Sequence, residues 1–153
     1  MPNEMSPETL ATQAQKKQLN KKPSRPKNRP KSYRRSSTQQ LGSHYETLAA
    51  QYLRQHGLDI LLRNIRSRFG EIDLIARSHH SLIFIEVRYR KNQQYGGAIY
   101  SIHPTKQQRI KRVAGQLLPQ LSASFFGGVQ PFCRFDVIAI DEDGLQWIPN
   151  AFY

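Results

Sequence analysis

The chain is poor in cysteine and in long apolar runs. Its single cysteine, Cys133, excludes any disulfide within the chain, which is typical of a reducing compartment. No N-terminal stretch has the pattern of a signal peptide, and no apolar run is long enough to span a bilayer. We therefore expect a cytoplasmic protein without membrane contact. No glycine-rich phosphate loop follows a strand-like run, so no nucleotide cofactor is expected either.

Acidic residues are also scarce, and the excess positive charge is uneven. The formal net charge is +12; residues 1–42 hold ten Lys or Arg against two acids, and residues 43–153 hold thirteen against nine. This asymmetry predicts a basic tail on one folded domain, with nucleic acid or another polyanion as partner, although a merely solubilising tail would look the same. Five of the nine prolines lie in residues 1–42, which we expect to be disordered.

Helical and strand-like patterns alternate along residues 43–153. Ser43 and Glu46 form a capping-box pattern, followed by apolar residues at helical spacing as far as Gly57. Three sequential strands predict an antiparallel meander, and a fourth strand that follows a second helix can pair in parallel through a crossover. The prediction is an α/β fold with a mixed central sheet flanked by helices. The expected strands are 58–65, 71–77, 82–90, 132–140 and 145–148, and the second helix begins near Pro104.

Two carboxylates lie inside the second and third strand-like runs. A turn centred between residues 79 and 80 pairs residues whose numbers sum to 159, which places Asp73 opposite Glu86. Opposed residues have Cβ atoms about 5 Å apart, so the two carboxylates would repel unless a cation lay between them. Oxygen ligands suit magnesium or manganese. The alternative is an edge pair of carboxylates balanced by Arg88 and Arg90.

The turn is the weak element of this pairing. His-His suits a two-residue hairpin turn poorly, because such turns favour Asn or Gly at positive φ. A four-residue loop from Ser78 to Ser81 keeps the same register, whereas a loop longer or shorter by one residue would shift it. The same register predicts a cross-strand ion pair between Glu71 and Arg88, with metal binding by Glu71 as the alternative.

Together these motifs resemble the YraN-like family of bacterial proteins over about residues 42–153. The matching residues are Tyr45, Glu46, Asn64, Arg66, Gly70–Ile75, Phe84–Arg90, Lys106, Arg134–Val137, Trp147, Ala151 and Phe152. That family in turn resembles the restriction-endonuclease-like superfamily and its Holliday-junction resolvases. The resemblance implies a restriction-endonuclease-like fold and a metal-dependent endonuclease. Its substrate would be DNA rather than RNA, branched or otherwise structured, and a homodimer is one expected state.

The resemblance also implies roles for individual residues. Asp73 and Glu86 would bind Mg²⁺ or Mn²⁺ with the backbone carbonyl of Val87, and Glu46 would approach the same site from the first helix. Arg88 occupies the position where the superfamily normally has lysine. Arginine cannot lose its proton, so Arg88 could only neutralise charge on the phosphate. A DNA- or RNA-binding module that keeps the fold without cutting therefore remains the alternative function.

Further candidates lie around this motif, each with a structural alternative. Basic residues of a turn and of a helix N-terminus suit phosphate contacts, but could equally be solvated surface. These residues are Arg66, Arg68, Lys106 and Gln107. Glu46 divides evenly between a site role and helix capping. For Asp136, within an apolar strand, we favour a structural hydrogen-bonding role. The segment Tyr95–Tyr100 would suit a substrate-contacting loop or an ordinary one.

Overall fold

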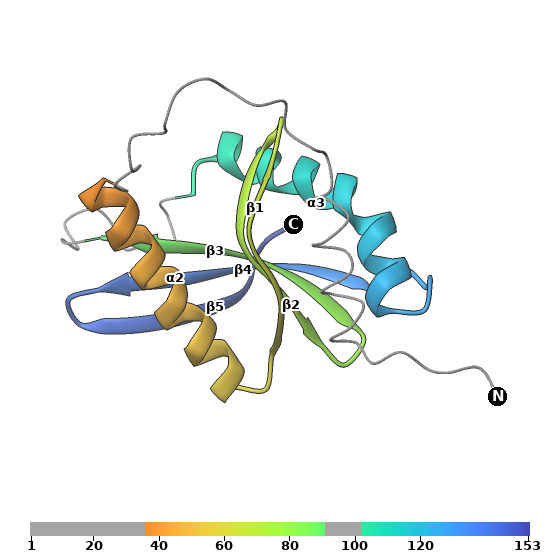
Figure 1. Cartoon of the computed structure of the whole chain (residues 1–153), viewed down its shortest axis with the longest axis horizontal. Coiled ribbons are helices and arrows are strands. Elements are labelled where there is room, and N and C mark those ends of the chain that lie inside the picture. Colours follow the sequence, from red (N-terminus) through yellow and green to blue (C-terminus); the bar gives the residue numbers. More distant parts are fainter. Residues whose placement is uncertain (1–35, 91–101) are drawn as a thin grey trace, which may run out of the picture. The chain divides into compact units, whose positions relative to one another are not determined.

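The computed structural model describes residues 36–90 and 102–153 of the chain (Figure 1). Residues 1–35 of the predicted disordered tail and the segment Tyr95–Tyr100 lie outside these ranges. Within them, no helix has the length and apolar character needed to cross a membrane. The elements, in chain order, are α2 (Ser37–Gln55), β1 (Asp59–Ser67), β2 (Gly70–Ser78), β3 (Ser81–Tyr89), α3 (Pro104–Phe125), β4 (Phe132–Asp141) and β5 (Gly144–Phe152).

The five strands form one mixed sheet in the order β1-β2-β3-β4-β5. β3 and β4 are parallel, with Ser81 opposite Phe132 and Tyr89 opposite Ile140, and the other neighbours are antiparallel. The helix α3 lies in the crossover that a parallel pair requires. The predicted α/β class is confirmed, as is the combination of a meander with one parallel strand. This arrangement is compatible with a restriction-endonuclease-like fold.

One helix packs on each face of the sheet. α2 contributes Ala49, Ala50 and Leu53 to a core with Leu74, Ala76, Ile83, Ile85, Ile138 and Ile140. α3 contributes Ile110, Val113, Ala114 and Leu121 to a second core with Ile72, Ile75, Leu82, Phe84, Val137 and Phe152. The strands β2, β3 and β4 are therefore buried on both faces, which explains their near-continuous apolar sequences.

The β2–β3 register agrees with the sequence prediction. Ser78 pairs with Ser81 and Leu74 pairs with Ile85, so paired residue numbers sum to 159. The turn contains only two residues, and His79 accommodates it with a φ of +45°. A two-residue turn was not the favoured prediction, but it gives the same register as the longer loop.

The predicted start of the first helix is wrong. α2 begins at Ser37, and its N-cap is Ser36, whose side chain accepts a hydrogen bond from Gln39 N while Gln39 returns one to Ser36 N. Ser43 and Glu46, which resemble a capping box in sequence, lie inside the helix. Residues 37–42, which we assigned to the tail, are therefore helical, because the real capping box uses Gln rather than Glu.

Candidate active site

Asp73 lies where the strand β2 changes the face it presents. Alternate residues of a regular strand share one face, yet Ile72 belongs to the core under α3 and Leu74 to the core under α2. The residue of β1 that lies between the partners of Ile72 and Leu74 is Asn64, which has a φ of +54°. Left-handed Asn thus accompanies a local rotation of the hairpin at the position of Asp73.

The backbone pairing of β2 with β3 ends one residue before Asp73 and Glu86. Leu74 opposite Ile85 is the last pair, and beyond it Asp73 Oδ2 accepts a hydrogen bond of 2.8 Å from Val87 N. The carboxylate of Asp73 therefore replaces a strand carbonyl as partner of β3. It holds the two strands together where their ladder stops, beside Glu86.

Glu86 is buried and faces the α3 side of the sheet. Its side chain is 3% exposed, with Oε1 lying 3.1 Å from Lys106 Nζ and 3.7 Å from Arg88 Nη1. Burial raises the pKa of Glu86, and the charges of Lys106 and Arg88 counteract only part of that rise. Within the described residues, Glu86 Oε2 is buried and accepts no hydrogen bond. One oxygen of this carboxylate is thus available to a further ligand.

Asp73 shares this electrostatic environment. Burial, followed by the charge of Glu86, raises the pKa of Asp73 from 3.8 to about 7, although the Val87 N–H and Lys106 act in the opposite direction. Glu46 of α2 adds to the rise, so it lies within electrostatic reach of Asp73. In the part of the chain that the structure describes, Glu46 Oε2 is also buried without a hydrogen-bond partner. The structure therefore places Asp73 near Glu86 and within electrostatic reach of Glu46, which lies inside α2 and does not cap it.

An aromatic stack positions Glu46. Its neighbour Tyr45 stacks on Tyr89 at the end of β3, with ring centroids 4.0 Å apart and planes at 12°. A hydrogen bond with Tyr89 raises the pKa of Tyr45 to about 12. Because Tyr45 is fixed on β3, the next residue of α2 is held near the carboxylates of β2 and β3.

The carboxylate oxygens of Asp73 and Glu86 and the backbone carbonyl oxygen of Val87 are the type of ligand that a hard divalent cation takes. Within residues 36–90 and 102–153, no three His, Cys, Asp or Glu side chains are placed to hold a metal ion by themselves. Mg²⁺ needs fewer, because it usually keeps several waters and takes one or two protein carboxylates. Asp73 and Glu86, with the backbone carbonyl of Val87 and water, would meet that need. A cation there would also relieve the repulsion that raises the pKa of Asp73.

A basic groove adjoins the acidic pair. It has a volume of about 490 Å³ and is lined by Arg66, Ser67, Gly70, Glu71, Lys106 and Arg109. Gly70, in the turn between β1 and β2, has a φ of +148°, a backbone conformation that residues with a side chain rarely adopt. A Cβ on Gly70 would stand 3.5 Å from Arg109 Cβ. Lys106 lines the groove and also contacts Glu86.

The predicted nucleic-acid contacts divide into two groups. Arg66 and Lys106 line the groove, whereas Arg68 lies over the ring of Phe69 and Gln107 Nε2 donates to Ile102 O. The side-chain hydrogen bond of Gln107 therefore stabilises the N-terminal end of α3. The ion pair of Glu71 also differs from the prediction. Glu71 Oε2 lies 3.4 Å from Arg66 Nε of the neighbouring strand β1, whereas Arg88 Nη1 lies 3.7 Å from Glu86 Oε1.

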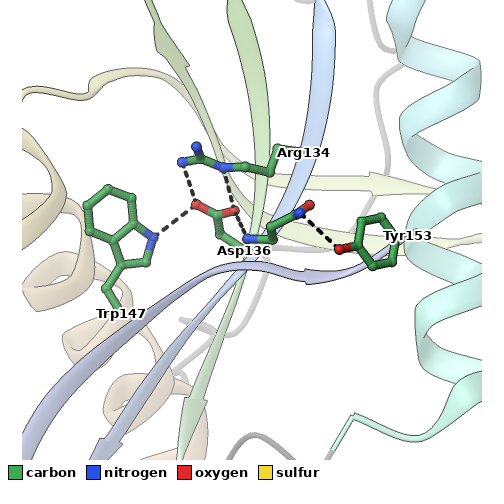
Figure 2. Close-up of polar contacts among 5 residues, drawn as sticks. Arg134, Asp136, Trp147 and Tyr153 are labelled. Atoms are coloured by element: carbon green, nitrogen blue, oxygen red, sulfur yellow. Dashed lines mark hydrogen bonds and ion pairs between the residues drawn. The ribbon is translucent and has the colours of Figure 1, made fainter.

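Asp136 is fully buried in a saturated hydrogen-bond network (Figure 2). Arg134 donates to both carboxylate oxygens at 2.8 and 2.9 Å, and Trp147 Nε1 and Asn150 N donate at 2.9 Å each. Figure 2 shows these groups gathered around the carboxylate of Asp136. The network joins β4 to β5, which agrees with the structural role favoured from sequence.

Known proteins resemble this chain over the part of the sequence that contains the candidate site. The chain matches the model of the uncharacterised protein family UPF0102 over residues 45–140. It belongs to this family. UPF0102 proteins of Yersinia pseudotuberculosis serotype O:1b and of Yersinia pestis bv. Antiqua are each 47% identical to it over 116 residues, or 76% of this chain and 97% of the relative. The range that matches UPF0102 includes Glu46, Asp73, Glu86 and Lys106.

Sequence reasoning about this UPF0102 chain missed Arg109 as a groove residue and the contact of Lys106 with Glu86. Helical spacing offered a signal for the first, because Arg109 follows Lys106 by three residues and shares its helix face. No local signal existed for the second, since it joins α3 to β3 through the packing of the sheet. The family resemblance itself is confirmed.

Proposed function

We propose that this protein binds nucleic acid and is a divalent-metal-dependent DNA endonuclease. The observation that carries the proposal is the junction at Lys106 of a basic groove with an acidic pair, in which Glu86 is buried and Asp73 is half-buried. A phosphodiester needs cations along its backbone and a metal ion at the bond that breaks. Arg66, Lys106 and Arg109 could provide the cations along the backbone. Asp73 and Glu86 could hold the metal ion.

The chain's own groups have distinct tasks in this proposal. Asp73 and Glu86, with the Val87 carbonyl, hold Mg²⁺ or Mn²⁺, which when bound lowers the pKa of water and polarises a phosphoryl oxygen. Glu46 contributes a further carboxylate within electrostatic reach of Asp73. Arg88, beside Glu86, donates hydrogen bonds to a phosphoryl oxygen and balances the charge that develops there.

The substrate class follows from the resemblance and from the open groove. The superfamily that the YraN-like family resembles includes Holliday-junction resolvases, so branched or otherwise structured DNA is the proposed substrate. Contacts to phosphates through Arg66 and Arg109 would be independent of base sequence. A homodimer, which would bring two sites to one junction, remains part of the proposal.

A binding module that does not cut is the second candidate, and Arg88 favours it. In the sequence motif this residue replaces a lysine, and an arginine cannot take part in proton transfer. The module would use the same groove, with Lys106 remaining on Glu86. Its ligand would be structured DNA or RNA.

A cleavage and binding assay tests both functions. Branched, nicked and single-stranded DNA would be incubated with Mg²⁺ or Mn²⁺ and with wild-type protein, Asp73→Asn, Glu86→Gln or the surface control Asp59→Asn. We expect the first two variants to lose cutting and to keep binding, and the control to retain both. A wild type that binds all substrates without cutting any would establish the binding module. Absence of binding would refute both functions.

The predicted basic tail has a separate test. Removing residues 1–35 keeps the cap at Ser36 and should flatten the dependence of binding on salt, because each phosphate contact adds about 0.9 to the slope on duplex DNA. An unchanged slope would exclude the tail from binding.

A further inference from the structure

Lys106 contacts the buried carboxylate of Glu86 and also lines the basic groove. Its ammonium lies 3.1 Å from Glu86 Oε1, while its side chain is 29% exposed and lines the groove beside Arg66 and Arg109. None of the other groove residues makes an ion pair with Glu86 in the described structure. Lys106 is therefore the physical link between the acidic pair and the basic surface.

The backbone at Lys106 is anchored by hydrogen bonding at the start of α3. Pro104 opens α3 after the N-cap His103, and Lys106 N donates to His103 O at 2.8 Å. From this anchored turn the side chain extends as a flexible four-carbon stem with a compact charge at its end. Such a charge can exchange partners within reach of its stem without moving the helix.

The charges at the site favour such an exchange. Without a metal ion, Lys106 and Arg88 are the two cations beside the buried carboxylate of Glu86. A divalent cation between Asp73 and Glu86 would satisfy the same oxygens and repel the ammonium at short range. A phosphate in the groove would attract the ammonium at the same moment. Binding of the two ligands would then be linked.

We propose that Lys106 is an exchangeable counter-ion, which holds Glu86 in the free protein and transfers to a nucleic-acid phosphate in the groove when a divalent cation binds. The inference rests on the proposed function and adds a regulatory step to it. By linkage, a strand in the groove raises the affinity for the cation, and the cation raises the affinity for the strand by the same factor. The acidic site is thereby loaded preferentially when substrate is present.

Manganese titration of the full chain tests the exchange without relying on cleavage. Mn²⁺ affinity would be measured by calorimetry one to two pH units above the Asp73 pKa of about 7, with and without a short DNA strand. Phosphorothioate linkages keep the charge of that strand and resist hydrolysis. The variants are Asp73→Asn, which tests the metal centre itself, and Lys106→Gln, Lys106→Arg and Arg112→Gln. The last removes one exposed positive charge from the same helix as a control. Circular dichroism would verify that each variant folds.

The exchange predicts a specific pattern. Lys106→Gln alone should bind Mn²⁺ about tenfold more tightly than wild type, because the competing ammonium is gone. The gain in Mn²⁺ affinity caused by DNA should be about tenfold smaller in Lys106→Gln than in wild type. Arg112→Gln should behave as wild type, and Lys106→Arg should lie between, because a charge at this position is retained.

Two other outcomes are informative in different ways. If Mn²⁺ and DNA enhance each other equally in wild type and in Lys106→Gln, the exchange is wrong while the metal-dependent function stands. If wild type binds no Mn²⁺, or if Asp73→Asn binds it as well as wild type does, both the exchange and the proposed metal centre fail.

Discussion

Asp73 should make the protein less stable as the pH rises, and one isosteric substitution should remove this effect. The pKa of Asp73 rises from 3.8 to about 7 on folding, first because of burial and then because of Glu86. Between those values the unfolded chain releases the proton and the folded chain keeps it. The stability associated with this carboxyl is therefore complete below about pH 4 and is lost progressively up to about pH 7.

The size of the effect follows from the pKa difference. The rise from 3.8 to about 7 spans about three pH units, each worth about 1.4 kcal/mol, which gives an upper limit of about 4 kcal/mol. Partial access of water and the coupling to Glu86 reduce this figure, so we expect about 2 kcal/mol. Asp73→Asn keeps an oxygen that can accept the hydrogen bond from Val87 N but carries no charge. This variant should therefore be about 2 kcal/mol more stable than wild type near pH 8.

Urea denaturation between about pH 4 and about pH 8, without divalent ions, measures the difference. The two curves should converge at the acid end, where both side chains are neutral. Asp59→Asn is the matched control, because Asp59 is 58% exposed and its pair with Arg77 should contribute less than about 1 kcal/mol. Parallel curves for wild type and Asp73→Asn would show that burial of the acidic pair does not raise the Asp73 pKa, and the reasoning would be refuted.

Three further sets of substitutions test the framework around the site. Asp136→Asn leaves Arg134 without its buried carboxylate and should cost about 3–5 kcal/mol in urea denaturation; a loss below about 1 kcal/mol would contradict the structural role. Asn64→Val should lower the free energy of unfolding by about 1–2 kcal/mol, because a β-branched residue is strained at positive φ, and Asn64→Gly should change it little. Equal melting temperatures for the two variants would argue against the local rotation of the hairpin. Ser36→Ala should cost about 1 kcal/mol and Ser43→Ala less than half as much; the reverse order would restore the cap at Ser43.

The sequence contained enough information for the central hairpin but not for its surroundings. Asp73 and Glu86 lie beside each other because a local turn sets the β2–β3 register, and a turn can be found in one short segment. The start of α2 was wrong because Ser43 and Glu46 imitate a capping box that Ser36 and Gln39 form in the structure. Helix ends depend on a few competing side chains, so their sequence signals are ambiguous.

Contacts between distant elements were the part beyond prediction. Lys106 reaches Glu86 only because α3 packs across β2 on the same face that Glu86 occupies. Neither the charge pattern nor the hydrophobic periodicity of the sequence predicts that Lys106 and Glu86 lie close together. Glu71 forms its ion pair with Arg66 on β1 rather than with Arg88 as expected. The β2–β3 ladder ends at Leu74, so Glu71 lies beyond the paired part of β2 and next to β1.

The acidic pair is difficult to explain as a stabilising feature. Asp136 shows how this chain satisfies a buried carboxylate, with four donated hydrogen bonds and no free oxygen. Glu86 and Glu46, by contrast, each keep a buried oxygen without a partner among the described residues, and Asp73 gains a raised pKa. Unsatisfied buried groups cost free energy and persist where a ligand uses them. The contrast between the satisfied carboxylate of Asp136 and the unsatisfied oxygens of Glu86 and Glu46 is therefore the strongest physical argument for the proposed cation site.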